Sequence, residues 1–179
     1  VYYQQSIATY RSVIPDKINF GNLFLNLGVT IVGLGGVYET QQDWASAQKC
    51  YREAVDLLEK EALEGEKDVL LNKGMALSRL AYALSETTLL EEAKQKYQLA
   101  ADAFVEAAQF AGYEAASFYQ RGLALAGFAE MNLQQGNQDA AQKAYKLAID
   151  AYDEVMEREN DHVDAIYNLS LIHISEPTR

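Results

Sequence analysis

The segment Ile31–Val55, IVGLGGVYETQQDWASAQKCYREAV, joins two helical patterns through a polar run at residues 40–43. Small and aromatic residues recur at intervals of one, three and four on both sides of that run: Leu34, Gly35 and Tyr38 before it, and Ala47, Tyr51 and Ala54 after it. Residues three or four positions apart share one face of an α-helix. The segment therefore predicts a hairpin of two antiparallel helices, in which the small residues allow a close approach.

The same intervals recur twice further along the chain. The residues concerned are Leu80, Ala81, Leu84, Ala93, Tyr97 and Ala100 in the second copy, and Phe128, Ala129, Asn132, Ala141, Tyr145 and Ala148 in the third. Measured at Ala47, Ala93 and Ala141, the copies follow one another at intervals of 46 and 48 residues. Three copies in phase predict a stack of similar hairpins, because each unit must bury its apolar face against its neighbours.

This pattern resembles the signature of the tetratricopeptide repeat (TPR) family, which has a small residue and Tyr on its first helix, then Ala, an aromatic residue and Ala on its second. The resemblance extends over residues 28–170. The family period is about 34 residues, so the longer intervals here indicate a long-helix variant, and the family's closing proline is absent. The resemblance implies an all-α fold, a right-handed α-solenoid of antiparallel helical hairpins.

The chain opens inside what looks like a second helix, so we treat it as a fragment of a longer solenoid. Gly65 and Gly112 are expected to end second helices, and Asp43 and Thr88 are expected to cap the helices that follow them. Helices within the hairpins are predicted at 18–38, 43–64, 66–87, 89–110, 114–135 and 138–159. The expected units are a second helix of a preceding repeat at 1–15, hairpins at 16–65, 66–112 and 113–160, the start of a fourth hairpin at 161–169, and a tail at 170–179. That tail resembles translated sequencing-adapter text and shows no continuing helical stripe, so we expect it to be non-native rather than a natural short tail.

The composition suits long helices, with 49% apolar residues, 2 prolines and 11 glycines among 179 residues. The 15 basic and 26 acidic residues give a net charge of −11, which argues against nucleic acid as a partner because that needs clustered Lys and Arg. The acidic balance favours either a solvated helix surface or a basic partner. Cys50 has no histidine near it in the sequence, so we expect a packed thiol, no enzymatic activity, no cofactor and no metal site.

Residues 18–38 carry no charge and are numerous enough to span a membrane. Asparagines and glycines within the segment favour a buried first helix instead, because a lipid-facing helix would have to bury polar amides. A dinucleotide-binding fingerprint at Gly33–Gly36 is not expected, since Tyr38 stands where the third glycine is required. We expect a cytoplasmic protein, with a membrane anchor at 18–38 as the alternative.

In TPR proteins a partner usually lies on the concave face built by the first helices. By register, the predicted groove positions are Asn72, Met75, Arg79, Tyr82 and Glu86 on the second pair, Tyr119, Leu123, Ala126, Glu130 and Leu133 on the third, and Val29, Val32, Gly36 and Glu39 on the first. Arg79 with Tyr82 suits a carboxylate beside an apolar side chain, and Met75 and Leu123 suit apolar anchors of a helix. Alternatively, some of these side chains pack against the next repeat. The family's clamp for C-terminal carboxylates is not expected, because only Arg79 matches its basic positions.

These features predict a non-enzymatic scaffold for protein–protein interaction, which binds a helix or extended peptide with apolar anchors and some basic character. Two alternatives stay open. One is a regulatory or sensor array within a larger enzyme, transcription factor or secretion protein; the other is a membrane-tethered assembly factor anchored by residues 18–38. Self-association is a further open alternative.

Overall fold

The computed structural model describes residues 2–13, 23–62 and 67–175. Within these ranges the chain forms α-helices and no strand. The helices are α1 (Tyr2–Val13), α2 (Leu23–Thr40), α3 (Trp44–Ala62), α4 (Lys67–Ser85), α5 (Leu90–Ala107), α6 (Glu114–Gln134), α7 (Gln138–Arg158) and α8 (Val163–Ser175). The described part of the protein is therefore all-α, which confirms that part of the predicted fold class.

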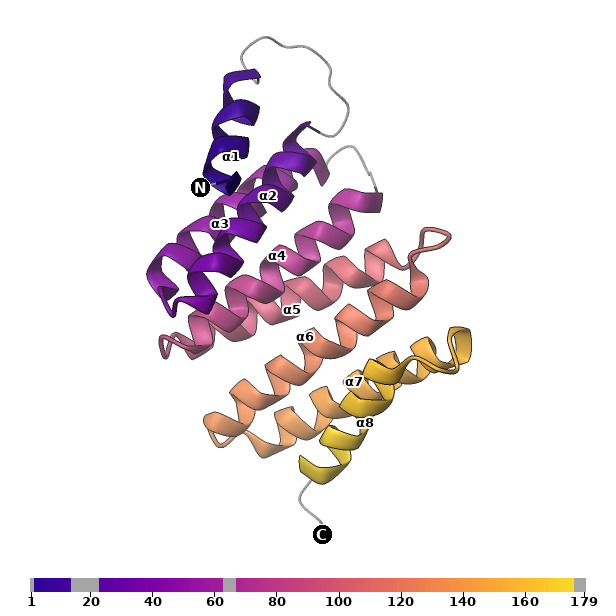
Figure 1. The fold of residues 1–179 in the computed structure, drawn as a ribbon. Coiled ribbons are helices and arrows are strands. Elements are labelled where there is room, and N and C mark those ends of the chain that lie inside the picture. Colours follow the sequence, from indigo (N-terminus) through magenta and orange to yellow (C-terminus); the bar gives the residue numbers. More distant parts are fainter. Residues whose placement is uncertain (1, 14–22, 63–66, 176–179) are drawn as a thin grey trace.

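Consecutive helices run antiparallel and stack in chain order (Figure 1). The pairs α2–α3, α4–α5 and α6–α7 have the most extensive contacts, and α4 also touches both α2 and α6. Helices α2, α4 and α6 run parallel to one another in one layer, with α3, α5 and α7 behind them (Figure 1). We call the layer of α2, α4 and α6 the first-helix face, and this face carries the site described below.

The repeated small and aromatic residues lie in the interior between the two layers. The three alanines in phase, Ala47, Ala93 and Ala141, are fully buried, as is Tyr51. Methyl-sized side chains let the helix backbones approach closely, and the tyrosine rings fill the space beside each contact. The buried residues form one cluster that continues from α1 to α8, so the helices share a single core along the stack.

A second repeated contact, which our sequence analysis missed, joins each first helix to its hairpin partner. Three glycines in phase, Gly28, Gly74 and Gly122, face Leu58, Phe104 and Tyr152 respectively. A Cβ atom on Gly74 would lie 2.5 Å from Cε1 of Phe104, and one on Gly122 would lie 2.5 Å from Cε1 of Tyr152. Each ring thus packs directly on helix backbone, and the glycine is needed because no side chain fits there. The signal was visible in the sequence as glycines at the same 46- and 48-residue intervals.

One of the two predicted caps is confirmed and the other is wrong. The carboxylate of Asp43 accepts a hydrogen bond from the Ser46 amide at 3.1 Å, as an N-cap does. Thr88 instead adopts a left-handed backbone with φ of +61°. The N-cap position of α5 is Leu89, which offers no side-chain hydrogen bond. The turn before α5 is closed by backbone bonds, such as that from the Leu89 amide to the Leu84 carbonyl at 3.1 Å.

Several helix boundaries differ from the predicted ones. Helix α5 stops at Ala107 rather than at 110, because the backbone tightens into bonds between residues three apart, such as Phe110 N to Ala107 O at 3.2 Å. The expectation that the helical pattern stops at 170 is wrong, since α8 continues to Ser175 and buries Ile172. The non-native origin of the tail stays a prediction. Gly65 and residues 18–22 of the predicted first helix lie outside the described residues.

Helix α2 is the one described helix that is long and apolar enough to cross a bilayer. The criterion uses length and composition alone, and the core helices of globular proteins also meet it. In this structure α2 packs against α1, α3 and α4. Its place in the stack is that of a first helix.

Candidate partner-binding groove

A cavity of about 570 Å³ opens on the first-helix face between α4 and α6. Its size is within the usual range for ligand sites. The residues that line it are Glu39, Met75, Ser78, Arg79, Tyr82, Tyr97, Tyr119, Gln120, Leu123 and Ala124. We call this cavity and the adjoining exposed surface of α2, α4 and α6 the groove.

Helix α4 supplies one wall of the cavity through four residues at helical spacing. Met75, Ser78, Arg79 and Tyr82 follow one another at steps of three, one and three, so they form a single stripe. Met75 and Tyr82 are 37% and 41% exposed. The opposite stripe of α4, which includes Leu80, is buried in the core. The amphipathic pattern of α4 therefore turns these side chains toward the groove.

Six of the fourteen predicted groove residues line this cavity: Glu39, Met75, Arg79, Tyr82, Tyr119 and Leu123. The others, which include Asn72, Glu86 and Glu130, lie outside its lining. The side-chain amide of Asn72 donates to the Asp68 carbonyl of its own helix at 2.7 Å, so it is already occupied. Glu86 is exposed just beyond the C-terminus of α4, and Glu130 lies on α6 seven residues beyond Leu123, on the same stripe.

Tyr97 lines the cavity although it belongs to a second helix and our sequence analysis placed it only in the repeat core. Its ring passes directly over Gly127 of α6, where a Cβ atom would lie 2.5 Å from Cζ of Tyr97. The missing side chain at Gly127 thus lets the end of the tyrosine reach the groove. A glycine on the predicted groove helix was the available sequence signal.

A hydrogen-bonded network borders the cavity and holds the one cation among its lining residues. Nη1 of Arg79 lies 3.0 Å from Oε1 of Glu39, and the fully buried Tyr51 donates its hydroxyl to Oε2 of Glu39 at 2.6 Å. Burial, and then the hydrogen bond to Glu39, raise the pKa of Tyr51, so it stays protonated as a donor. Arg79 is thus already paired within the chain, which weakens the expectation that it awaits a partner carboxylate.

The ring of Tyr82 is held by the only tryptophan of the chain. Trp44, the first residue of α3, packs edge-on against Tyr82 with ring centroids 5.8 Å apart and an interplanar angle of 85°. Edge-to-face pairs of this kind are favourable for aromatic rings. The exposed tyrosine is therefore preorganised at the mouth of the cavity.

Burial and carboxylates set the electrostatics of the groove. Glu130 is an exposed residue, yet the surrounding protein desolvates its carboxylate and raises its pKa. Burial also raises the pKa of Tyr97, and the nearby carboxylates, Glu130 first, add to that rise, with Glu86 and Glu39 contributing in turn. Three carboxylates thus lie close enough to the Tyr97 hydroxyl to disfavour a negative charge on it.

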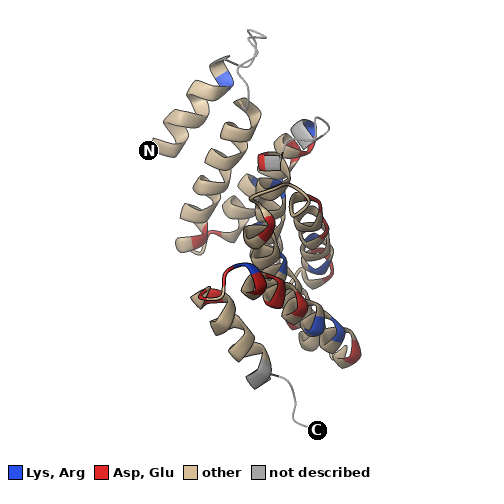
Figure 2. Cartoon of the chain, turned by 90° about the vertical axis from the view of Figure 1, so that its right-hand side faces the viewer, with Lys and Arg blue, Asp and Glu red and all other residues tan. Residues whose placement is uncertain are grey.

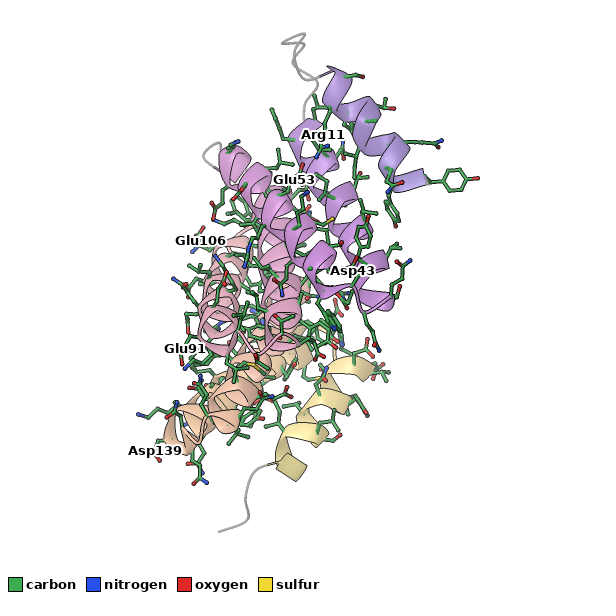
Figure 3. The ribbon with its side chains drawn as sticks, turned by 90° about the vertical axis from the view of Figure 1, so that its left-hand side faces the viewer. Arg11, Asp43, Glu53, Glu91, Glu106 and Asp139 are labelled. Carbon is green, nitrogen blue, oxygen red and sulfur yellow. The ribbon has the colours of Figure 1, made fainter. Side chains whose placement is uncertain are left out.

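Charged residues are sparse on the first-helix face and dense on the second helices (Figure 2). Helices α2, α4 and α6 carry one, four and three charged residues, whereas α3, α5 and α7 carry seven, six and eight. Figure 3 shows carboxylates such as Glu53, Glu91 and Glu106 around the second helices, with Arg11 of α1 paired to Glu53. Among these six helices the acidic excess thus lies on α3, α5 and α7, away from the groove.

Within the described ranges, no group of three His, Cys, Asp or Glu side chains is arranged to hold a metal ion. Cys50 is half-buried, and burial raises the pKa of its thiol. This environment disfavours the thiolate form that a nucleophile or ligand requires.

No protein-family model matches the chain, and no curated protein matches it significantly in sequence. The fold and the cavity define a class: an all-α protein of sequentially packed helices with a groove of mixed polar and apolar lining on one layer. The resemblance of the repeat residues to the TPR signature stays a prediction.

Proposed function

We propose that this chain is a TPR-like interaction module, a right-handed solenoid of helical hairpins that binds a segment of another protein in the groove. The bound segment is a helix or an extended peptide, and the module itself is not an enzyme. The observation that carries the proposal is the cavity between α4 and α6, whose exposed Met75, Tyr82 and Leu123 surround a preformed opening.

The distribution of exposed apolar side chains supports this proposal. Those on the first-helix face include Val29, Val37, Met75, Tyr82, Leu123 and Leu133, each between 37% and 43% exposed. They occupy the layer that is poor in charge, so few charged groups interrupt the apolar surface. Exposed apolar surface of this kind typically marks a contact with another protein, and side chains at helical spacing suit an amphipathic helix in a groove.

The test is to select binding peptides from a displayed library of amphipathic helices and to measure their affinity for groove variants. Tyr82→Ala with Leu123→Ala should weaken binding at least about tenfold, because buried aromatic and aliphatic anchors dominate such interfaces. The matched control is Leu99→Ala with Leu147→Ala on α5 and α7, where the two leucines are 42% and 45% exposed. Equal losses in both double variants would refute the groove, and unchanged helicity would show that the fold is intact.

A membrane-tethered assembly factor is the second candidate, favoured by the length and apolar composition of α2. It predicts that the expressed chain partitions with membranes. Recovery in the soluble fraction as a monodisperse species would exclude this candidate and leave the groove proposal standing.

A further inference from the structure

The floor of the cavity offers a polar group without a partner. Tyr97 is only 8% exposed, yet it lines the cavity, and its hydroxyl makes no hydrogen bond within the part of the chain that the structure describes. Oγ of Ser78 on the α4 wall is unpartnered within the described ranges, and it has almost no accessible surface that a ligand could touch. Polar groups inside proteins are normally hydrogen-bonded. The hydroxyl of Tyr97 therefore leaves an acceptor oxygen available to a bound group that donates hydrogen bonds.

The carboxylates around the cavity favour the binding of a positively charged group. Glu39 lines the cavity, whereas Glu86 and Glu130 lie outside its lining but near enough to raise the pKa of Tyr97. Helix dipoles add partial negative charge at the C-terminal ends of α2, α4 and α6. Arg79 is the one cation among the described lining residues, and Glu39 already pairs with it. Glu130 is an exposed residue whose pKa the surrounding protein raises, and no cation is bonded to its carboxylate in the described structure. A carboxylate without a partner is stabilised when a cation arrives.

We infer that this cavity receives a basic side chain, arginine or lysine, from the partner segment. The inference rests on the proposed function and specifies the chemistry of the partner. The guanidinium or ammonium donates to the hydroxyl of Tyr97 and lies beside the ring of Tyr82, which attracts cations through its π face. The alkyl stem packs on Met75 and Leu123, as the stems of basic side chains do on apolar surface.

The volume and the net charge agree with this occupant. A cavity of about 570 Å³ holds a long basic side chain together with part of a neighbouring apolar residue. The net charge of −11 favours encounter with a basic segment over an acidic one. The partner is therefore an amphipathic segment with a basic residue among its apolar anchors.

Three synthetic helical peptides test the inference directly. They share one leucine- and alanine-rich sequence and differ at a central position, which holds arginine, its neutral isostere citrulline, or glutamate. Trp44 reports binding by its fluorescence, because it packs on Tyr82 at the mouth of the cavity and no other tryptophan is present. The arginine peptide should bind about tenfold more tightly than the citrulline peptide, and added salt should reduce that preference.

Two isosteric variants test whether the preference for the arginine peptide over the citrulline peptide arises at the cavity. Glu130→Gln should reduce the preference for arginine over citrulline to less than about threefold, because it removes the unpaired carboxylate. Glu106→Gln on α5 removes the same charge from the second-helix layer and should leave the preference unchanged (Figure 3). An equal loss in both variants would mean that net charge alone selects arginine, and it would overturn the inference.

The peptide series also separates this inference from the proposed function. One outcome is that the arginine and citrulline peptides bind equally while Tyr82→Ala with Leu123→Ala abolishes the binding of both. That result would support the groove and refute the basic subsite. If the glutamate peptide binds most tightly, Arg79 determines which peptide the cavity prefers, and the inference of a basic subsite is refuted. If none of the three peptides binds at about 1 mM, the groove and the subsite fall together.

Discussion

Substitution of Gly74 by alanine tests the packing that joins each first helix to its hairpin partner. A Cβ at this position would lie 2.5 Å from Cε1 and 2.8 Å from Cδ1 of Phe104, a fully buried ring. Neither the ring nor the backbone of α4 can move away freely, because both lie inside the hairpin. Gly36 is the matched control, since it also lies within a first helix and its nearest such neighbour is the Tyr51 hydroxyl at 4.0 Å.

The two substitutions share one favourable term and differ in one unfavourable term. Replacing glycine by alanine within a helix gains about 1 kcal/mol through backbone entropy. Inserting a methyl group into a packed core costs about 1–3 kcal/mol. Gly36→Ala should therefore stabilise the protein by about 0.5–1 kcal/mol, whereas Gly74→Ala should destabilise it by up to about 2 kcal/mol. The difference between the two variants is the overpacking cost, about 1–3 kcal/mol.

The assay is urea denaturation followed by circular dichroism, with midpoints compared at equal slope. Combining Gly74→Ala with Phe104→Ala should show coupling of about 0.5–3 kcal/mol, because the new methyl group then fills part of a cavity instead of clashing. The reasoning is refuted if Gly74→Ala is as stable as Gly36→Ala, or if the two changes at 74 and 104 are additive.

Three other predictions concern the groove and a cap. Tyr51→Phe removes the hydrogen bond to Glu39 and should destabilise the protein by about 1–2 kcal/mol, measured by denaturation. Glu130→Gln should raise the free energy of unfolding at neutral pH. Burial raises the pKa of Glu130 above the ordinary 4.5, so the contribution of Glu130 to wild-type stability is fully present below that value and is lost as pH rises through the folded pKa. Denaturation midpoints of the Gln variant should therefore exceed those of the wild type at neutral pH and converge with them in acid. Asp43→Ala should lower the midpoint near neutral pH; hydrogen bonds from Ser46 depress the pKa of Asp43, so this loss should shrink as pH falls through the folded pKa. A pH-independent difference would contradict either assignment.

Much of the fold was predictable from local spacing. Residues at steps of three and four identified the helices, and the intervals of 46 and 48 residues paired them, because helix periodicity depends on nearby residues alone. The register taken from the resemblance to the TPR family placed Met75, Tyr82 and Leu123 among the groove positions. Thr88 escaped prediction, since its side chain is a common cap while its left-handed backbone is set by the turn that joins α4 to α5.

The sequence by itself determined the helical periodicity, the order of the hairpins and the acidic excess. Only the tertiary structure decided how residues from different helices meet. Tyr97 reaches the cavity because Gly127, 30 residues later, leaves room for its ring. Arg79 is already paired within the chain because Glu39, 40 residues earlier, lies across from it on α2. Such contacts depend on the separation and rotation of packed helices, which the spacing along one helix does not specify.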